Sequence, residues 1–360
     1  MDAQISTAST TSRNQYWKSL PENLFPTSLA VDAITSISKY EQHSLVFIFR
    51  HEEHPSIILY QRTNNKYTLL LDLPGSEYYI GVILQNYFYI FCGVAQPYTV
   101  YRLDLTHKRK QWEKVGILQA NVKQAQAIGV DKILLSNYSK SYIYDPLECE
   151  LTDTPMQNSG FHDMRTIVQN DIYFLGGFDK RESNQMKISD KIDIYNISSH
   201  SWRTGPKIPI PLVAAGMTVY RDRWIILIGG NVPDENVIEE CFVYDTLFQE
   251  WNKSQMGLPS PRSNHRCCIV NQDLLIIGGH ELELDSSTAQ GTIPFINISY
   301  ILPRWCMVGH WVILRKLLEN GRADFIMNGP ETKEKDFFRK LFMELALDMF
   351  QVVLSFLTYE

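Results

Sequence analysis

Three groups of residues in this chain have the side chains that chemistry needs. The first is His51-Glu52-Glu53-His54, whose histidines and carboxylates are potential metal ligands. Its spacing differs from the helical HExxH pattern, in which two histidines one turn apart bind zinc. The cluster also follows directly on a strand-like apolar run. We therefore expect a solvated loop here rather than a metal site.

The second group is the cysteine pair Cys267-Cys268, which lies in a strand-like apolar run. Successive side chains of a strand point to opposite faces, so we expect the two thiols to pack rather than to act together in redox chemistry. The chain has six cysteines and no CxxC motif, which favours reduced, mostly buried thiols in a cytoplasmic protein.

Motifs of the common enzyme classes are missing from the sequence. It contains no GxxxxGK[ST], GxGxxG, GxSxG or HExxH, the patterns that hold phosphates, dinucleotides, an activated serine or a catalytic zinc. We therefore predict a protein that is not an enzyme and has no cofactor and no bound metal.

Charge and hydropathy exclude further classes. The net charge is −6, with 34 basic and 40 acidic residues, whereas a nucleic-acid-binding protein normally presents a basic field. The first residues, MDAQISTASTTSRNQ, are polar, so we expect no secretory signal. No run of about 20 apolar residues is present, and we expect no membrane span.

The elements that would position any site are internal repeats. Three segments share an apolar run ending in Gly-Gly, a second run with a Tyr-type residue, and a tryptophan seven residues after it. The motif residues are Gly176, Gly177, Tyr195 and Trp202; Gly229, Gly230, Tyr244 and Trp251; and Gly278, Gly279, Ile298 and Trp305. Weaker copies place Tyr-type positions at 60, 103 and 144, so the spacing runs from 41 to 54 residues.

This pattern resembles the kelch-repeat family over about residues 28–309. The resemblance implies an all-β, six-bladed kelch-type β-propeller, with one four-stranded blade per repeat of about 50 residues. The glycine pairs, tyrosines and tryptophans then have structural roles, and we expect Trp202 and Trp251 to be largely buried between blades. Thirteen of the 17 residues in 341–357 are apolar, which favours a short helical C-terminal extension. We expect a disordered N-terminal arm (1–14), the propeller (15–309) and the extension (310–360).

A propeller must close its ring, because an open blade leaves exposed sheet edges. Residues 15–20 resemble the outer strand of a repeat, with Trp17 in the place of Trp251. We predict that they supply the outer strand of the last blade by pairing with residues 294–300. The alternative is a strand around Trp305, which stands in register in its own repeat.

The third group with chemical potential is Pro261-Arg262 with His265, in a loop between repeats. In kelch proteins that capture peptides, such loops and those after the glycine pairs line one face of the propeller. The resemblance therefore points to a binding face, and the polar side chains best suited to it are Arg181, Asn231, Arg262, His265 and His280. Arginine offers a planar fork for carboxylates, and asparagine and histidine add directional hydrogen bonds.

The resemblance implies a non-catalytic protein–protein interaction module. Two roles stay open: substrate recognition in a cullin-type ubiquitin ligase, with a ligase component as partner, or a cytoskeletal scaffold that binds a protein such as actin. Only about 27 residues precede the first repeat, too few for the BTB or F-box module of ligase adaptors. The alternative function is a small-molecule enzyme, mutarotase-like or lyase-like, that uses the central channel.

Overall fold

The structure is a computed structural model, and the chain divides into two units, Met1–Ile301 and Leu302–Glu360. Only part of the chain is described below. The described residues are 14–20, 34–40, 44–49, 56–64, 66–74, 79–93, 97–120, 122–137, 140–154, 164–179, 187–281 and 293–302.

In the described part of the first unit there are six four-stranded antiparallel sheets, which we call blades 1 to 6. Blades 1 to 3 contain β2 (Ile34–Tyr40), β3 (Ser44–Phe49), β4 (Ser56–Gln61) and β5 (Lys66–Asp72); β6 (Tyr79–Leu84), β7 (Tyr87–Cys92), β8 (Tyr98–Asp104) and β9 (Trp112–Leu118); and β10 (Gln124–Ile128), β11 (Lys132–Ser136), β12 (Ser141–Asp145) and β13 (Glu150–Asp153). Blades 4 to 6 contain β14 (Met164–Val168), β15 (Asp171–Leu175), β18 (Ile192–Asn196) and β19 (Ser201–Thr204); β20 (Gly216–Tyr220), β21 (Trp224–Ile228), β22 (Cys241–Asp245) and β23 (Glu250–Lys253); and β25 (Arg266–Val270), β26 (Asp273–Ile277), β28 (Pro294–Asn297) and β1 (Lys18–Ser19).

Short elements complete the described part of the chain. They are two two-stranded ribbons, β16 (Phe178–Asp179) with β17 (Lys187–Ile188) and β24 (Arg262–Ser263) with β27 (His280–Glu281), and the 3₁₀ turns η1 (Asn14–Tyr16), η3 (Pro233–Glu235) and η4 (Ile298–Tyr300).

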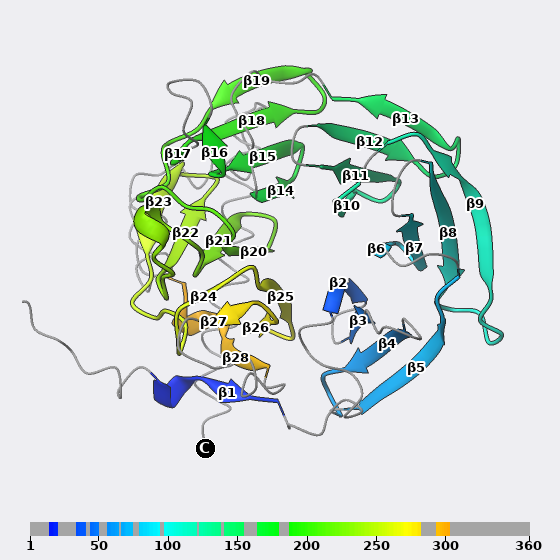
Figure 1. Cartoon of the computed structure of the whole chain (residues 1–360), viewed down its shortest axis with the longest axis horizontal. Helices are drawn as coiled ribbons and strands as arrows, with labels where there is room; N and C mark the ends of the chain where they lie inside the picture. Colours follow the sequence, from blue (N-terminus) through cyan, green and yellow to red (C-terminus); the bar gives the residue numbers. More distant parts are fainter. Residues whose placement is uncertain are drawn as a thin grey trace, which may run out of the picture. The chain divides into compact units, whose positions relative to one another are not determined.

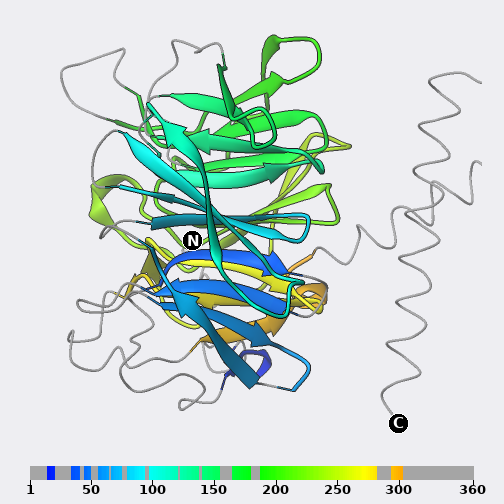
Figure 2. The same ribbon diagram turned by 90° about the vertical axis from the view of Figure 1, so that its right-hand side faces the viewer.

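The six blades form a closed ring. The first strand of each blade contacts the first strand of the next, in the order β2, β6, β10, β14, β20, β25 and back to β2 (Figure 1). Turned by 90°, the strands run from one face of the ring to the other (Figure 2). The predicted kelch-type propeller is confirmed, because this closed arrangement of twisted sheets is the propeller architecture.

Strand register explains the seven-residue spacing in the sequence. Tyr195 pairs directly with Trp202, and Tyr244 with Trp251. The two tyrosines are 1% and 0% exposed, whereas both tryptophans, which lie on outermost strands, are only half-buried. The expected packing between blades is confirmed, although each ring keeps some exposed surface: Trp202 packs against a cluster that joins blades 3 and 4, and Trp251 against one that joins blades 4 and 5.

The Gly-Gly pairs stand where the second strand of a blade ends. Gly176 and Gly229 have φ of 56° and 66°, a region that side chains other than glycine rarely adopt. A Cβ on Gly176 would come within 2.3 Å of the Leu212 carbonyl oxygen, and one on Gly229 within 2.5 Å of the Arg262 carbonyl oxygen. The chain after each pair thus packs against the backbone that leads into the next blade.

The ring is closed by the N-terminal strand, as predicted. In β1, Lys18 pairs with Phe295 and Ser19 with Pro294 of β28, and the Leu20 amide donates to the Ile293 carbonyl at 3.0 Å. Leu20 is 3% exposed, in a cluster that includes Tyr60 of blade 1 and Leu275 of blade 6. Both ends of the propeller segment therefore contribute to one blade.

The register of blade 6 corrects one detail of the repeat pattern. In β28, Ile296 pairs with Leu274, as Tyr244 pairs with Ile225 in blade 5. Ile296, and not Ile298, therefore holds the Tyr-type position. The seven-residue interval from Ile298 to Trp305 was a coincidence of spacing.

Several predicted features lie outside the described residues. They are the helical extension 310–360, the arm 1–14 apart from Asn14, the cluster 51–54, Arg181 and Trp305. Within the described part of the chain, no helix has the length and apolar character needed to cross a membrane.

Candidate functional site

The candidate site lies where blades 5 and 6 meet, around the ribbon β24–β27 (Figure 1). Arg262 pairs with Glu281 across this ribbon, and Ser263 pairs with His280. The ribbon therefore brings together Arg262 and His280, which are 18 positions apart in the sequence.

Hydrogen bonds fix this ribbon to blade 5 and to blade 6. The Gly230 amide donates to the Arg262 carbonyl at 2.8 Å, and Arg262 Nη1 donates to the Gly278 carbonyl at 2.8 Å. Asn231 and Val213 exchange two hydrogen bonds, of 2.7 and 3.0 Å, from each amide to the other carbonyl. Arg262 and Asn231 are consequently held by one connected set of hydrogen bonds, which we call the framework.

His265 lies beneath this framework rather than on its surface. It is 5% exposed, and its imidazole lies against two glycines of blade 5. A Cβ on Gly216 would come 2.3 Å from Nε2, and one on Gly229 would come 2.8 Å from Cε1. The two glycines therefore make the space that the ring occupies.

Burial also sets the protonation state of His265. Desolvation, with a smaller contribution from the positive charge of Arg262, lowers the pKa of His265 to about 3. The Ile228 carbonyl, which neither ring nitrogen reaches in hydrogen-bond geometry, opposes this shift. The imidazole is therefore neutral at physiological pH, able to donate one hydrogen bond and accept another.

Three buried polar atoms at this site have no hydrogen-bond partner among the described residues. They are Nδ1 and Nε2 of His265 and Oδ1 of Asn231. Buried polar atoms without partners are rare in folded proteins, because each forgoes its hydrogen bonds to water. The site thus combines unused hydrogen-bonding capacity with a nearby guanidinium.

The thiols at the site are poor nucleophiles. Burial raises the pKa of Cys241 and of Cys267 well above the usual value for a thiol, and the thiolate is the reactive form. Among the described residues, no group of three histidines, cysteines or acidic residues is placed to hold a metal ion. The arrangement suits recognition by hydrogen bonds and charge.

Four of the five predicted binding residues are therefore local neighbours along one framework: Asn231, Arg262, His265 and His280. The sequence did not indicate Gly216, on which the imidazole of His265 lies. The available signal was the run of small residues Ala214-Ala215-Gly216, which leaves room for a larger neighbour from the next blade.

Comparison with known proteins places this geometry in context. A family model described as the KLHDC2/KLHL20/DRC7 Kelch-repeats domain matches residues 82–279, more than half of the chain. The match begins in blade 2 and ends at the second glycine of blade 6, so it includes the framework around Asn231 and Arg262.

The individual relatives described here are each less than 30% identical to the chain over the matched residues. The chain is 28% identical over 170 residues to Kelch-like protein terF of Aspergillus terreus, covering 46% of this chain and 36% of the relative. It is 29% identical over 170 residues to Kelch-like protein 40b of Danio rerio, covering 46% and 27%. It is 28% identical over 142 residues to tRNA wybutosine-synthesizing protein 4 of Saccharomyces cerevisiae, covering 38% and 19%. The matches thus span little more than a third of these relatives at most.

Proposed function

The chain belongs to the kelch-repeat family, and we propose that it is a non-catalytic interaction module that binds a protein partner at the boundary of blades 5 and 6. In this proposal the binding face is formed by Asn231, Arg262 and His280, with His265 buried beneath them, and it also includes Arg181, which lies outside the described residues.

One observation carries this proposal: polar atoms that find no partner in the described part of the chain lie buried at the base of a ribbon that bears arginine and histidine. A partner would contact the half-buried side chains of Asn231 and Arg262, while the imidazole of His265, which is 5% exposed, supports them from beneath. The guanidinium of Arg262 would attract a carboxylate on the same partner. Recognition of this kind requires no reactive nucleophile, in agreement with the raised pKa values of the buried thiols.

The cellular role of this interaction module is a second part of the proposal. We propose a cytoplasmic protein that presents a partner either to a cullin-type ubiquitin ligase or to a cytoskeletal assembly, with a ligase component or actin as the second protein. The support is the kelch resemblance alone, so the first experiment must identify partners without assuming either role.

An enzyme that uses the central channel, mutarotase-like or lyase-like, is the second candidate. The observation that favours this candidate is the match to tRNA wybutosine-synthesizing protein 4, whose name describes a synthetic activity. That match covers 19% of the relative, so the activity in its name remains a property of that protein.

Affinity purification of the full chain with mass spectrometry tests the proposal. We expect Arg181→Ala/Arg262→Ala, and separately His280→Ala, to lose partners that the unaltered chain retains. Lys132→Ala/Lys207→Ala is the matched control, since Lys132 belongs to β11 of blade 3 and Lys207 follows β19 of blade 4, so neither is part of the ribbon. Equal recovery of partners by all variants, with unchanged thermal melting, would remove these residues from the binding face.

A further inference from the structure

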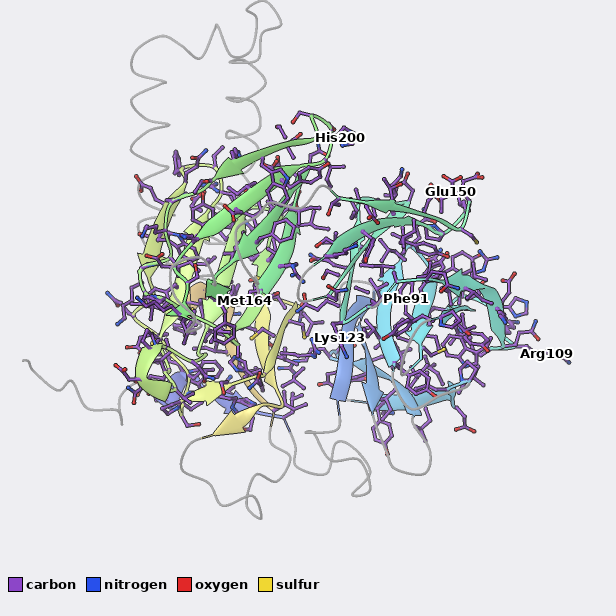
Figure 3. The ribbon with its side chains drawn as sticks, turned by 45° about the horizontal axis from the view of Figure 1, so that its top comes forward. Phe91, Arg109, Lys123, Glu150, Met164 and His200 are labelled. Atoms are coloured by element: carbon purple, nitrogen blue, oxygen red, sulfur yellow. The ribbon has the colours of Figure 1, made fainter. Side chains whose placement is uncertain are left out.

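The turn that leads to the outermost strand of blade 2 differs from its counterparts. In blades 1, 3, 4 and 5 this turn has four residues, whereas between β8 and β9 it has seven, 105–111. Its sequence, Leu-Thr-His-Lys-Arg-Lys-Gln, contains three consecutive cations. Arg109 lies at the tip of the turn, on the outer side of the ring (Figure 3).

Local hydrogen bonds hold this turn in shape. Asp104 Oδ1 accepts from the Thr106 amide and from the Thr106 hydroxyl, each at 2.7 Å, and from the His107 amide at 3.2 Å. The Arg109 amide donates to Nδ1 of His107 at 3.2 Å, and Lys110 Nζ donates to the Leu105 carbonyl. The backbone that carries the cations is therefore ordered before any partner arrives, which lowers the entropic cost of binding.

The cations at the tip are not neutralised within the described part of the chain. Lys108 and Arg109 are exposed, and their side chains make no ion pair with a described residue. The nearby Glu113 is already taken, since it accepts from Arg102 Nε at 2.7 Å. Lys114, next along β9, is exposed as well. The turn is thus a positive island on a chain whose net charge is −6.

Strand β9 adds an apolar contact beside this island. It is the outermost strand of blade 2, and Ile117 near its end is 54% exposed. In the pairing of β9 with β8, Val115 has no partner and forms a β-bulge. The Sγ atom of Cys149 lies 3.5 Å from the Val115 carbonyl oxygen. A bulge of this kind hinders pairing with another strand, so side chains rather than backbone make the contact.

We propose that the outer wall of blade 2, formed by the turn 105–111 and β9, docks an acidic segment of a partner protein that also carries apolar side chains. Carboxylates of the segment pair with Lys108, Arg109 and Lys114, and an apolar side chain covers Ile117. A long polyanion such as a nucleic acid or an anionic membrane fits less well, because the chain as a whole has 40 acidic residues against 34 basic ones and would repel it. This surface is separate from the ribbon β24–β27 and does not depend on the function proposed for it.

Fluorescence anisotropy with the full chain tests this surface. The probe is a labelled synthetic peptide of repeated Glu-Glu-Leu, and the reference peptide has Gln in place of Glu. We expect the Glu peptide to bind, with an affinity that falls as salt is added. Lys108→Glu/Arg109→Glu should weaken it by about tenfold or more, the effect of turning two surface attractions into repulsions, and Ile117→Ser should weaken it by a smaller factor.

The matched control is Lys187→Glu/Lys207→Glu, which makes the same change in net charge at exposed positions on or just beyond blade 4. Binding of this variant should equal that of the unaltered chain. Equal loss in both double variants would attribute binding to the overall field and overturn the proposal. Failure of the Glu peptide to bind, equal binding of the Gln peptide, or tighter binding of phosphatidylserine vesicles or duplex DNA would overturn it too.

Discussion

Blades 5 and 6 have the same four-stranded architecture but are assembled differently. Blade 5 is one continuous stretch, from Gly216 to Lys253, with an outermost strand of four residues. Blade 6 takes three strands from residues 266–297 and its outermost strand, of two residues, from Lys18–Ser19. Blade 5 can therefore form locally, whereas blade 6 forms only when distant parts of the chain meet.

Contacts from outside its own sheet compensate for the short outermost strand of blade 6. Arg62 of blade 1 bonds Asp273 at 2.8 Å, with both side chains mostly buried, and its guanidinium lies 4.4 Å from the ring centre of Phe295. Blade 5 instead has an internal ion pair, Arg223 with Asp245, whose side chains are 3% and 1% exposed. One blade is thus stabilised from within, and the other by its neighbours.

The largest effect is expected at the internal pair of blade 5. Asp245 accepts from Nε and Nη2 of Arg223 at 2.9 and 2.7 Å, so Asp245→Ala leaves a buried guanidinium without its carboxylate. We expect a loss of about 3–5 kcal/mol in the free energy of unfolding, measured in urea. Lys253→Gln, which breaks the exposed pair with Glu240 in the same blade, should cost less than about 1 kcal/mol. Similar losses in both would contradict the distinction.

The next effect is expected at the strand that closes the ring. Leu20→Ala removes a side chain that is 3% exposed from the cluster joining blades 1 and 6. We expect a loss of about 2–4 kcal/mol, with the amides of β25, β26 and β28 exchanging hydrogen before those of blade 5. Lys18→Ala, at an exposed position of the same strand, is the control and should change little. Simultaneous exchange in both blades would show that closure adds no local weakness.

The sequence predicted the ring and its closure because both depend on local patterns. A Tyr-type residue and a tryptophan seven positions later face each other across a hairpin, so this pairing leaves a trace within one repeat. Trp17 stands in the same sequence context as Trp251, but the inner strands of a repeat do not precede it in the chain. The false interval from Ile298 to Trp305 shows the limit of spacing alone, since only the pairing of Ile296 with Leu274 fixes the register.

The candidate site was less predictable, because its environment comes from contacts between blades. The motif around Arg262 indicated a binding loop, but the burial of His265 depends on Gly216, about 50 positions away in another blade. Nothing in the sequence near His265 shows that its nitrogens lack partners.

The stability of the boundary between blades 5 and 6 should depend on pH through His265. The folded protein keeps this imidazole neutral down to a pKa of about 3, against an ordinary value of 6.5 for an exposed histidine. Between these values the unfolded chain binds the proton and the folded chain does not, so stability is full above pH 6.5 and falls as the pH falls. At pH 5 the loss should reach about 2 kcal/mol.

Unfolding in urea at pH 7 and pH 5 measures this effect, and His265→Asn provides the comparison. The variant keeps a polar side chain that does not titrate, so its stability should fall less between the two pH values than that of the unaltered chain. Equal falls would mean that other groups cause the acid sensitivity and that His265 takes up a proton in the folded state.

The smallest effect is expected from removing the indole N–H donor of Trp17, and it tests whether Trp17 is equivalent to the tryptophans of continuous blades. Trp17 Nε1 donates to the Gly257 carbonyl at 2.9 Å, and Trp251 Nε1 donates to the Pro206 carbonyl at 3.2 Å. Each acceptor follows the outermost strand of the preceding blade, and Trp112 makes a similar contact at 2.9 Å with the carbonyl of Asp72, the last residue of such a strand. The indole thus links neighbouring blades in the same way whether its strand is continuous with the blade or comes from the far end of the chain.

Phenylalanine in these places keeps an aromatic ring but removes the N–H donor. Trp17→Phe and Trp251→Phe should therefore each lower the free energy of unfolding by about 1 kcal/mol, the net value of one hydrogen bond. If the two losses agree, the N-terminal strand reproduces the contacts of a continuous blade and the weakness of blade 6 lies in its length alone. A markedly larger loss for Trp17→Phe would show that the closing strand depends on its indole more than a strand in a continuous hairpin does.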